Sequence, residues 1–186
     1  MVYVALLRGI NVGGNNKIDM KLLKQTFEKA GMNDVVTYIN TGNIIFSYKR
    51  PSKTDLQRIL EEAIHRDFGL QIKVVVRSFD DVSRIINAIP YTWKNDKDMK
   101  SDVMFLWDEV DDESVLMDLT IKPTIDTVKY VPGAILWSVD KINVTKSGIS
   151  KIVGSKLYKQ VTVRNVNTAR KIYKLMQDQN DSFTRS

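Results

Sequence analysis

The stretch VYVALLRGINVGGNNKIDMKLLKQTFEKAG, residues 2–31, carries the signals that decide the fold of the amino-terminal half. Residues 2–7 are apolar at both odd and even positions, which is typical of a central strand covered on both faces. Asp19 is placed to cap a helix whose apolar residues follow at helical spacing, and Gly31 supplies its end. The stretch therefore predicts a strand, a glycine-rich loop and a helix.

Two β-rich runs follow at residues 35–39 and 44–48. The four residues between them, Asn-Thr-Gly-Asn at 40–43, tolerate a positive φ, so the pattern predicts two strands joined by a tight turn. The rest of this half predicts a helix opened by the Ser52 and Asp55 pair and ended by Gly69, a strand at 72–77, and a helix at 79–88 that begins at the Ser78 and Asp81 pair.

The order of elements repeats after the polar segment YTWKNDKDMKS, residues 91–101. The second half predicts strands at 103–107, 126–131, 135–139 and 161–163, and helices at 111–119, 148–158 and 165–176. Two rounds of βαββαβ, each with an extra helix, indicate an α+β fold of duplicated ferredoxin-like modules. We therefore expect an N-terminal module at 1–90, a linker at 91–101, a C-terminal module at 102–178 and a frayed tail at 179–186.

This topology also predicts which loops of the first module lie together. Right-handed crossovers make its first two strands parallel, with the third strand inserted between them and antiparallel to both. The loop at 8–17, the hairpin turn at 40–43 and the turn around Gly69 then share one edge of the sheet. A ligand site in this half is expected at that corner.

The loop RGINVGGNNK, residues 8–17, has the ingredients of an anion site. Its glycines free backbone N–H groups to face a ligand, the following helix presents its positive end, and Arg8 and Lys17 add charge. It is neither a Walker loop nor a G-x-G-x-x-G fingerprint, because Asn15 and Asn16 stand where a Walker loop needs Lys and Ser or Thr. A tight connection built on Asn and Gly in left-handed geometry explains the same residues equally well without a ligand.

A second polar cluster, TVRNVNT at 162–168, follows the last predicted strand. Asn165 or Asn167 can cap the final helix while Arg164 lies in a salt bridge; alternatively the cluster reaches the first module and helps Arg8 bind an anion. The candidate ligand-binding residues are Arg8, Asn11, Gly13, Gly14, Asn15, Lys17, Thr41, Gly42, Asn43, Arg164, Asn165 and Asn167. No residue is assigned a catalytic role, and no metal or cofactor is expected.

Three stretches of the chain resemble a known family. They are YVALLRGINVGGNNKIDM at 3–20, VVTYINTGNIIF at 35–46 and TVRNVNTARKIYKLM at 162–176, and they resemble the bacterial domain-of-unknown-function family numbered 1697. The resemblance covers nearly the whole length and implies the duplicated ferredoxin-like architecture without an established activity. The family's Ser-Gly-Asn hairpin stands here as Thr41-Gly42-Asn43, which keeps the hydroxyl.

The composition of the chain excludes several kinds of site and of cellular location. The chain has 186 residues, 43% hydrophobic and 27% charged, as in ordinary globular proteins. It contains no cysteine, which excludes disulfides, thiolate metal sites and thiol nucleophiles. The apolar start at 1–7 is too short for a signal peptide or a membrane span, and no other stretch is long enough for a span, so we expect a cytoplasmic location and no membrane partner.

Charge and single residues separate three function classes. The leading hypothesis is binding of an anionic small molecule, such as a nucleotide or phosphate-bearing metabolite, at the 8–17 loop. The alternative is non-specific nucleic-acid binding, because residues 141–174 hold nine basic and no acidic side chains in a chain of net charge +6. A small transferase or hydrolase is the third class, but it has no identifiable nucleophile, and the lone histidine, His65, lies off the apolar stripe of its helix.

Overall fold

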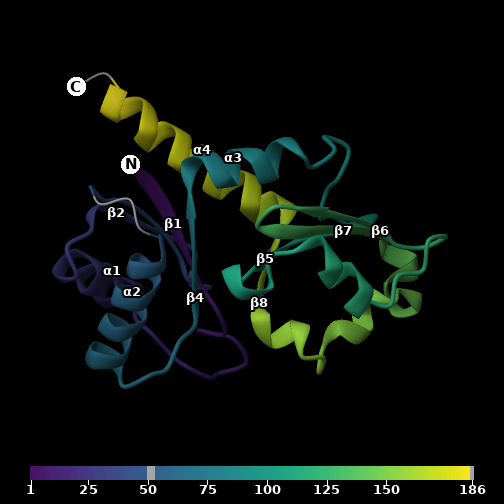
Figure 1. Ribbon diagram of the computed structural model, residues 1–186, viewed down its shortest axis with the longest axis horizontal. Coiled ribbons are helices and arrows are strands. Elements are labelled where there is room, and N and C mark those ends of the chain that lie inside the picture. The colour runs from purple at the N-terminus through teal and green to yellow at the C-terminus, as the bar shows by residue number, and fades with distance from the viewer. Residues whose placement is uncertain (50–52, 185–186) are drawn as a thin grey trace. The chain divides into compact units, whose positions relative to one another are not determined.

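The computed structural model describes residues 1–49 and 53–184, so the predicted capping residue Ser52 lies outside the described residues. The protein is α+β, with two four-stranded antiparallel sheets (Figure 1). It divides into two compact units: unit 1 holds Met1–Val82 and the end of the chain from Ile172, and unit 2 holds Ser83–Lys171. This division falls within a helix rather than in the polar segment at 91–101.

Unit 1 is built on a sheet of order β2-β3-β1-β4. In that order its strands are β2 (Asn33–Tyr38), β3 (Asn43–Ser47), β1 (Val2–Leu7) and β4 (Val74–Ser78). All six residues of β1 are buried, which confirms a central strand covered on both faces. Helices α1 (Met20–Lys29) and α2 (Lys53–Phe68) pack on one face, where Tyr3 stacks on Phe46 with ring centroids 5.8 Å apart.

Two of the caps predicted in unit 1 are present. The Asp19 carboxylate accepts hydrogen bonds from the amides of Lys21 and Leu22, at 2.8 and 3.0 Å, and so begins α1. The Asp81 carboxylate accepts from the amide and hydroxyl of Ser78, at 3.0 and 2.8 Å, at the start of α3 (Phe79–Asn87). Both helices therefore start where side-chain chemistry satisfies their first free amides.

Unit 2 is built on a sheet of the same order, β6-β7-β5-β8. Its strands are β6 (Thr127–Val131), β7 (Ala134–Asp140), β5 (Met99–Leu106) and β8 (Val161–Asn165). The register also repeats: Val4 of β1 pairs with Ile45 and Arg77, and Val103 of β5 pairs with Leu136 and Arg164. The sheet extends into the polar segment at 91–101, because β5 begins at Met99.

The prediction of two α-helices in unit 2 is wrong. In place of 111–119 and 148–158 the chain forms short 3-10 helices: η1 (Asp108–Val110), η2 (Glu113–Asp118), η4 (Ile149–Ile152) and η5 (Leu157–Gln160), with η3 (Lys141–Lys146) before them. Asp111 turns out of helical geometry because its carboxylate accepts from Tyr130 Oη at 3.0 Å and from the amide of Gly133 at 2.7 Å. Side-chain hydrogen bonds to distant groups thus replace the helical ladder.

The buried carboxylate of Asp126 organises the second of these segments. It accepts hydrogen bonds from the Ser147 hydroxyl, from Trp137 Nε1 at 3.2 Å, and from the amides of Gly148 and Lys122 at 2.9 and 3.0 Å. Although burial raises its pKa, these bonds outweigh the burial and hold the pKa below its usual value. The segment around Gly148 is therefore fixed to a strand end instead of opening an α-helix.

The last helix, α4 (Val166–Thr184), extends beyond Met176, where the sequence predicted its end. It begins as predicted, because Asn165 Oδ1 accepts from the amide of Thr168 at 2.9 Å. Tyr173 stacks on Phe79 at 5.6 Å, and Lys174 pairs with Asp178 at 2.9 Å. The helix continues to Thr184, through residues predicted to fray. Among the described residues, no helix is long and apolar enough to cross a membrane.

Candidate functional site

The 8–17 loop is a small hairpin with its own hydrogen bonds. The amide of Asn15 donates to the carbonyl of Val12 at 3.1 Å, and these two residues form an isolated β-bridge. Between them, Gly13 and Gly14 have φ of +60° and +79°, the paired left-handed conformation of a two-residue hairpin turn. The glycines predicted from the sequence as ligand-facing residues therefore form an exposed tip.

Asn11 ties this loop to the neighbouring hairpin. Its Nδ2 donates to the carbonyls of Asn40 at 2.8 Å and Ile18 at 3.0 Å, and its Oδ1 accepts from the amide of Ile18 at 2.9 Å. Both side-chain N–H groups are used inside the protein, at a residue whose own φ is +52°. Asn11 thus positions the loop.

The end of β1 lies between the two other turns predicted at this corner. The amide of Leu7 donates to the carbonyl of Gly42 at 2.9 Å, and the amide of Arg8 donates to the carbonyl of Lys73 at 3.0 Å. This confirms that the loop and the hairpin share one edge of the sheet. It also brings the segment that follows the Gly69 turn to the same edge.

The hairpin residues Thr41, Gly42 and Asn43 serve to build that edge. Asn43 is fully buried, and its Nδ2 donates to the carbonyl of Tyr38 at 3.0 Å and to Thr41 Oγ1 at 3.3 Å. Gly42 has φ of +83°, and a Cβ there would lie only 2.7 Å from Leu7 Cβ. The backbone of the hairpin therefore approaches β1 as closely as a glycine permits.

An open depression lies beside the loop, with a volume of about 530 Å³. It is lined by Asn11, Gly14, Lys17, Ile18, Asp19, Met20 and Asn40. Lys17 is exposed and brings a positive charge to the rim. The sequence predicts that the positive end of α1 faces a ligand here. This is wrong for the first amides of the helix, because those of Lys21 and Leu22 already donate hydrogen bonds to the Asp19 carboxylate. The donors near this depression, which we call the loop depression, are backbone amides of the exposed tip and Lys17.

The second predicted cluster lies in unit 2, where Arg164, Asn165 and Asn167 all have hydrogen-bond partners. Arg164 is 8% exposed, and its Nη1 donates to Thr162 Oγ1 at 3.0 Å and to the carbonyl of Val163 at 2.8 Å. Burial lowers its pKa to about 10, which leaves it charged at neutral pH. Asn165 caps α4, and Asn167 donates to the carbonyl of Asn95 at 2.9 Å. The reach of this cluster to Arg8 stays a prediction.

Sequence reasoning missed a buried counterpart of Arg164. Arg77 is 3% exposed, and its Nη1 likewise donates to the carbonyl of the residue before it, Val76, at 2.9 Å. The segments VVVRS at 74–78 and VTVRN at 161–165 place the two arginines at the same position of β4 and β8. Aligning these two short strands would have revealed the pair.

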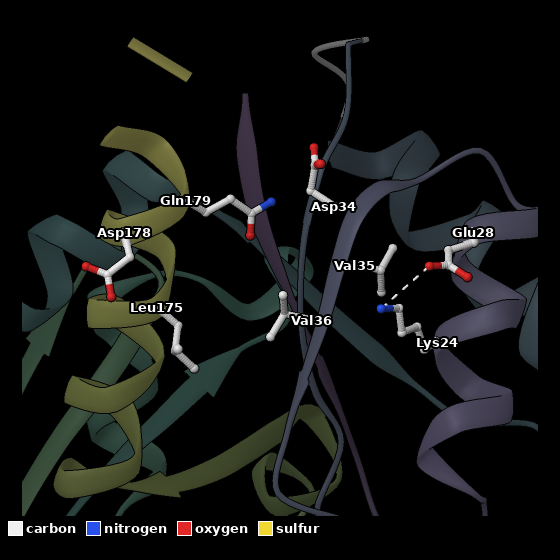
Figure 2. A pocket seen from close by; sticks show the side chains of 8 residues that line it. All are labelled: Lys24, Glu28, Asp34, Val35, Val36, Leu175, Asp178 and Gln179. Atoms are coloured by element: carbon white, nitrogen blue, oxygen red, sulfur yellow. Dashed lines mark ion pairs between the residues drawn. The ribbon is translucent and has the colours of Figure 1, made fainter. Parts of the chain in front are cut away.

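Sequence reasoning also missed a groove in unit 1. The β2 edge groove has a volume of about 470 Å³ and is lined by Lys24, Glu28, Asp34, Val35, Val36, Leu175, Asp178 and Gln179 (Figure 2). These residues come from α1, β2 and α4, and no local motif joins them. In the described part of the chain, this groove included, no group of three or more His, Cys, Asp or Glu residues is arranged to hold a metal ion.

These observations define an α+β protein with two antiparallel sheets of equal strand order. A family model described as "Protein of unknown function (DUF1697)" matches residues 1–137, and the chain belongs to this family. The solved structure of the conserved bacterial protein SP0830 from Streptococcus pneumoniae is similar, with a TM-score of 0.81 and 28% sequence identity over 94% of this chain and 98% of that one. A comparison with curated proteins gives no significant match.

Proposed function

We propose that unit 1 binds an anionic small molecule, such as a nucleotide or a phosphate-bearing metabolite, in the loop depression. The observation that carries this proposal is the placement of Gly14, at the exposed tip, and of Lys17 in the lining of one open hollow. Backbone amides and a nearby ammonium are the groups that proteins use for phosphate oxygens.

The tip has room for a ligand. A Cβ built on Gly13 or Gly14 would meet nothing within 4 Å, so nothing else in the chain crowds the backbone there. A ligand could therefore approach the amides of these two residues closely. The hydrogen bonds of Asn11 hold the loop in place before a ligand arrives, which lowers the entropy lost on binding.

The charge of the surroundings supports the same class of ligand. Asp19 is the acidic residue of the lining, and its carboxylate is engaged by two α1 amides, which offset part of its charge. The net charge of +6 draws anions toward the protein at low ionic strength. Lys17 supplies the local cation.

The architecture behind this site is, in our proposal, a duplicated ferredoxin-like module. Its support is the repeated strand order, the shared register around Val4 and Val103, and the equivalent arginines of β4 and β8. A cytoplasmic location, where nucleotides and phosphorylated metabolites are abundant, forms part of the same proposal.

The experiment that tests the function is a thermal-shift screen with ATP, GDP, pyrophosphate and ribose 5-phosphate. A ligand at 100 times its Kd stabilises the folded state by about 2.7 kcal/mol, which raises the Tm of a protein of this size by roughly 5–10 °C. Lys17→Ala should reduce this rise, whereas Lys21→Ala, which changes an exposed lysine outside the lining, should leave it intact. No rise with any of the four compounds would refute the proposal.

A further inference from the structure

The β2 edge groove follows a strand that has one unpaired side. β2 is the outermost strand of the order β2-β3-β1-β4, so the half of its backbone N–H and C=O groups that points outward has no strand beside it in the sheet. The groove runs along this edge, with α1 on one side and the end of α4 on the other (Figure 2). Both walls and the strand belong to unit 1.

The two walls of the groove, α1 and α4, face alternate residues of β2. Val36 pairs with Ile45 and lies on the side of Leu175, whereas Val35 belongs to the core beneath α1. Side chains of an added strand would alternate in the same way, one toward α1 and the next toward α4. Val36 is 42% exposed, so the α4 side offers an apolar surface.

Gln179 places an unsatisfied amide in this groove. Its Nε2 and Oε1 are both buried, and neither has a hydrogen-bond partner among the residues that the structure describes. Figure 2 shows the side chain extending from α4 toward β2. An unpaired buried donor or acceptor costs about 1–3 kcal/mol. A peptide group, with one N–H and one C=O, offers the two partners that this amide lacks.

The groove is acidic although the chain is basic. Three carboxylates, from Glu28, Asp34 and Asp178, line it together with one ammonium, from Lys24, which lies 3.8 Å from Glu28. The lining residues therefore sum to a charge of −2 in a protein of net charge +6, and Asp178 also pairs with Lys174, outside the lining, at 2.9 Å. A guest with a basic side chain complements it.

The shape of β2 favours a short guest over a second copy of the chain. Asp34 and Val35 together stand opposite Phe46, which makes a β-bulge, and Asp34 has φ of +51°. A bulge twists an edge strand away from a long flat partner and so opposes edge-to-edge pairing of two proteins. Beyond the bulge, residues 36–38 remain regular and can pair with a short strand.

We propose that the β2 edge groove binds an extended peptide that adds a strand to β2. The peptide backbone pairs with residues 36–38 and with the Gln179 amide, an apolar side chain packs on Val36 and Leu175, and a basic side chain faces the carboxylates. This proposal uses residues separate from the loop depression and does not depend on the anion site.

Titration of the whole protein with capped hexapeptides, followed by amide NMR shifts, tests the proposal. The probe is a hexapeptide in which valine alternates with lysine, and its control replaces each lysine with glutamate. The lysine peptide should shift amides within 33–38 and the side-chain amide of Gln179, and slow hydrogen exchange at the outward amides of β2. The glutamate peptide should bind at least about tenfold more weakly, by charge complementarity. Equal binding of both peptides, binding elsewhere, or no binding at millimolar concentration would overturn the proposal.

Two variants separate binding from folding. Gln179→Ala should lower the affinity for the lysine peptide about tenfold, which is the loss expected when two hydrogen bonds are removed. Gln177→Ala, on the same helix but outside the groove lining, should leave the affinity unchanged. Val36→Lys should abolish binding by placing a charge on the edge, with unchanged circular dichroism. Concentration-dependent dimers in light scattering that Val36→Lys removes would show that a second copy occupies the edge, and would also overturn the proposal.

Discussion

Replacing Gly42 with alanine tests how the hairpin closes on the 8–17 loop. Gly42 has φ of +83°, a left-handed conformation that costs an L-residue about 1–2 kcal/mol. A new Cβ would lie 2.7 Å from Leu7 Cβ and 2.9 Å from Ile10 Cδ1, in side chains that are both fully buried. Overpacking of a filled core costs about 1–3 kcal/mol. Gly42→Ala should therefore lower the free energy of unfolding by about 2–5 kcal/mol.

Gly13→Ala is the matched control. Its φ of +60° carries the same conformational cost, but its Cβ would meet nothing within 4 Å. Gly13→Ala should therefore lower the free energy of unfolding by only about 1–2 kcal/mol. Urea denaturation followed by circular dichroism measures both losses, with equal m-values as the sign that the denatured states match. Equal losses in the two variants would refute the close approach of the hairpin to Leu7 and Ile10.

Three further predictions concern the close packing and the hydrogen bonds that hold the loops in place. Gly148→Ala should prevent folding of unit 2, because its Cβ would lie 1.7 Å from the carbonyl oxygen of Thr120; a cooperative unfolding transition near the wild-type Tm would contradict this. Asp126→Asn should cost at least about 1.5 kcal/mol, since hydrogen bonds to a charged group are lost. Because the pKa of Asp126 is lowered in the folded state, its contribution should be fully present above the unfolded pKa of about 4 and disappear as pH falls through the folded value. Urea titrations of wild type and variant between pH 3 and 7 should converge in acid, and parallel curves would oppose this assignment. Asn11→Ala should cost about 1–3 kcal/mol and speed hydrogen exchange across residues 8–17; unchanged exchange would show that Asn11 does not hold the loop.

Much of unit 1 could be predicted because its signals are local. The apolar run of β1, the Asp19 cap and the turn at 40–43 each specify geometry within a few residues of themselves. Topology then placed the loop beside the hairpin, as the hydrogen bonds of Asn11 and Leu7 confirm. Local chemistry and chain order were enough for this corner.

The rest depended on partners distant in sequence. The segments at 111–119 and 148–158 have helix-like apolar spacing, yet the carboxylates of Asp111 and Asp126 bind groups on other strands and turns and hold the chain in 3-10 turns. The β2 edge groove joins α1 and β2 to the end of α4, which lie at opposite ends of the sequence. Helix propensity and the spacing of apolar residues do not reveal contacts between residues that are distant along the chain.

The anion site can be tested most directly by titrating the protein with pyrophosphate, a compact probe of phosphate binding, while its amide resonances are followed. The proposal predicts saturable shifts centred on Gly13, Gly14 and Lys17, a Kd that rises with salt, and a clear loss of affinity in Lys17→Ala. Shifts that are absent, or that gather on the lysines of 141–174 with Lys17→Ala binding as tightly as the wild type, would contradict it.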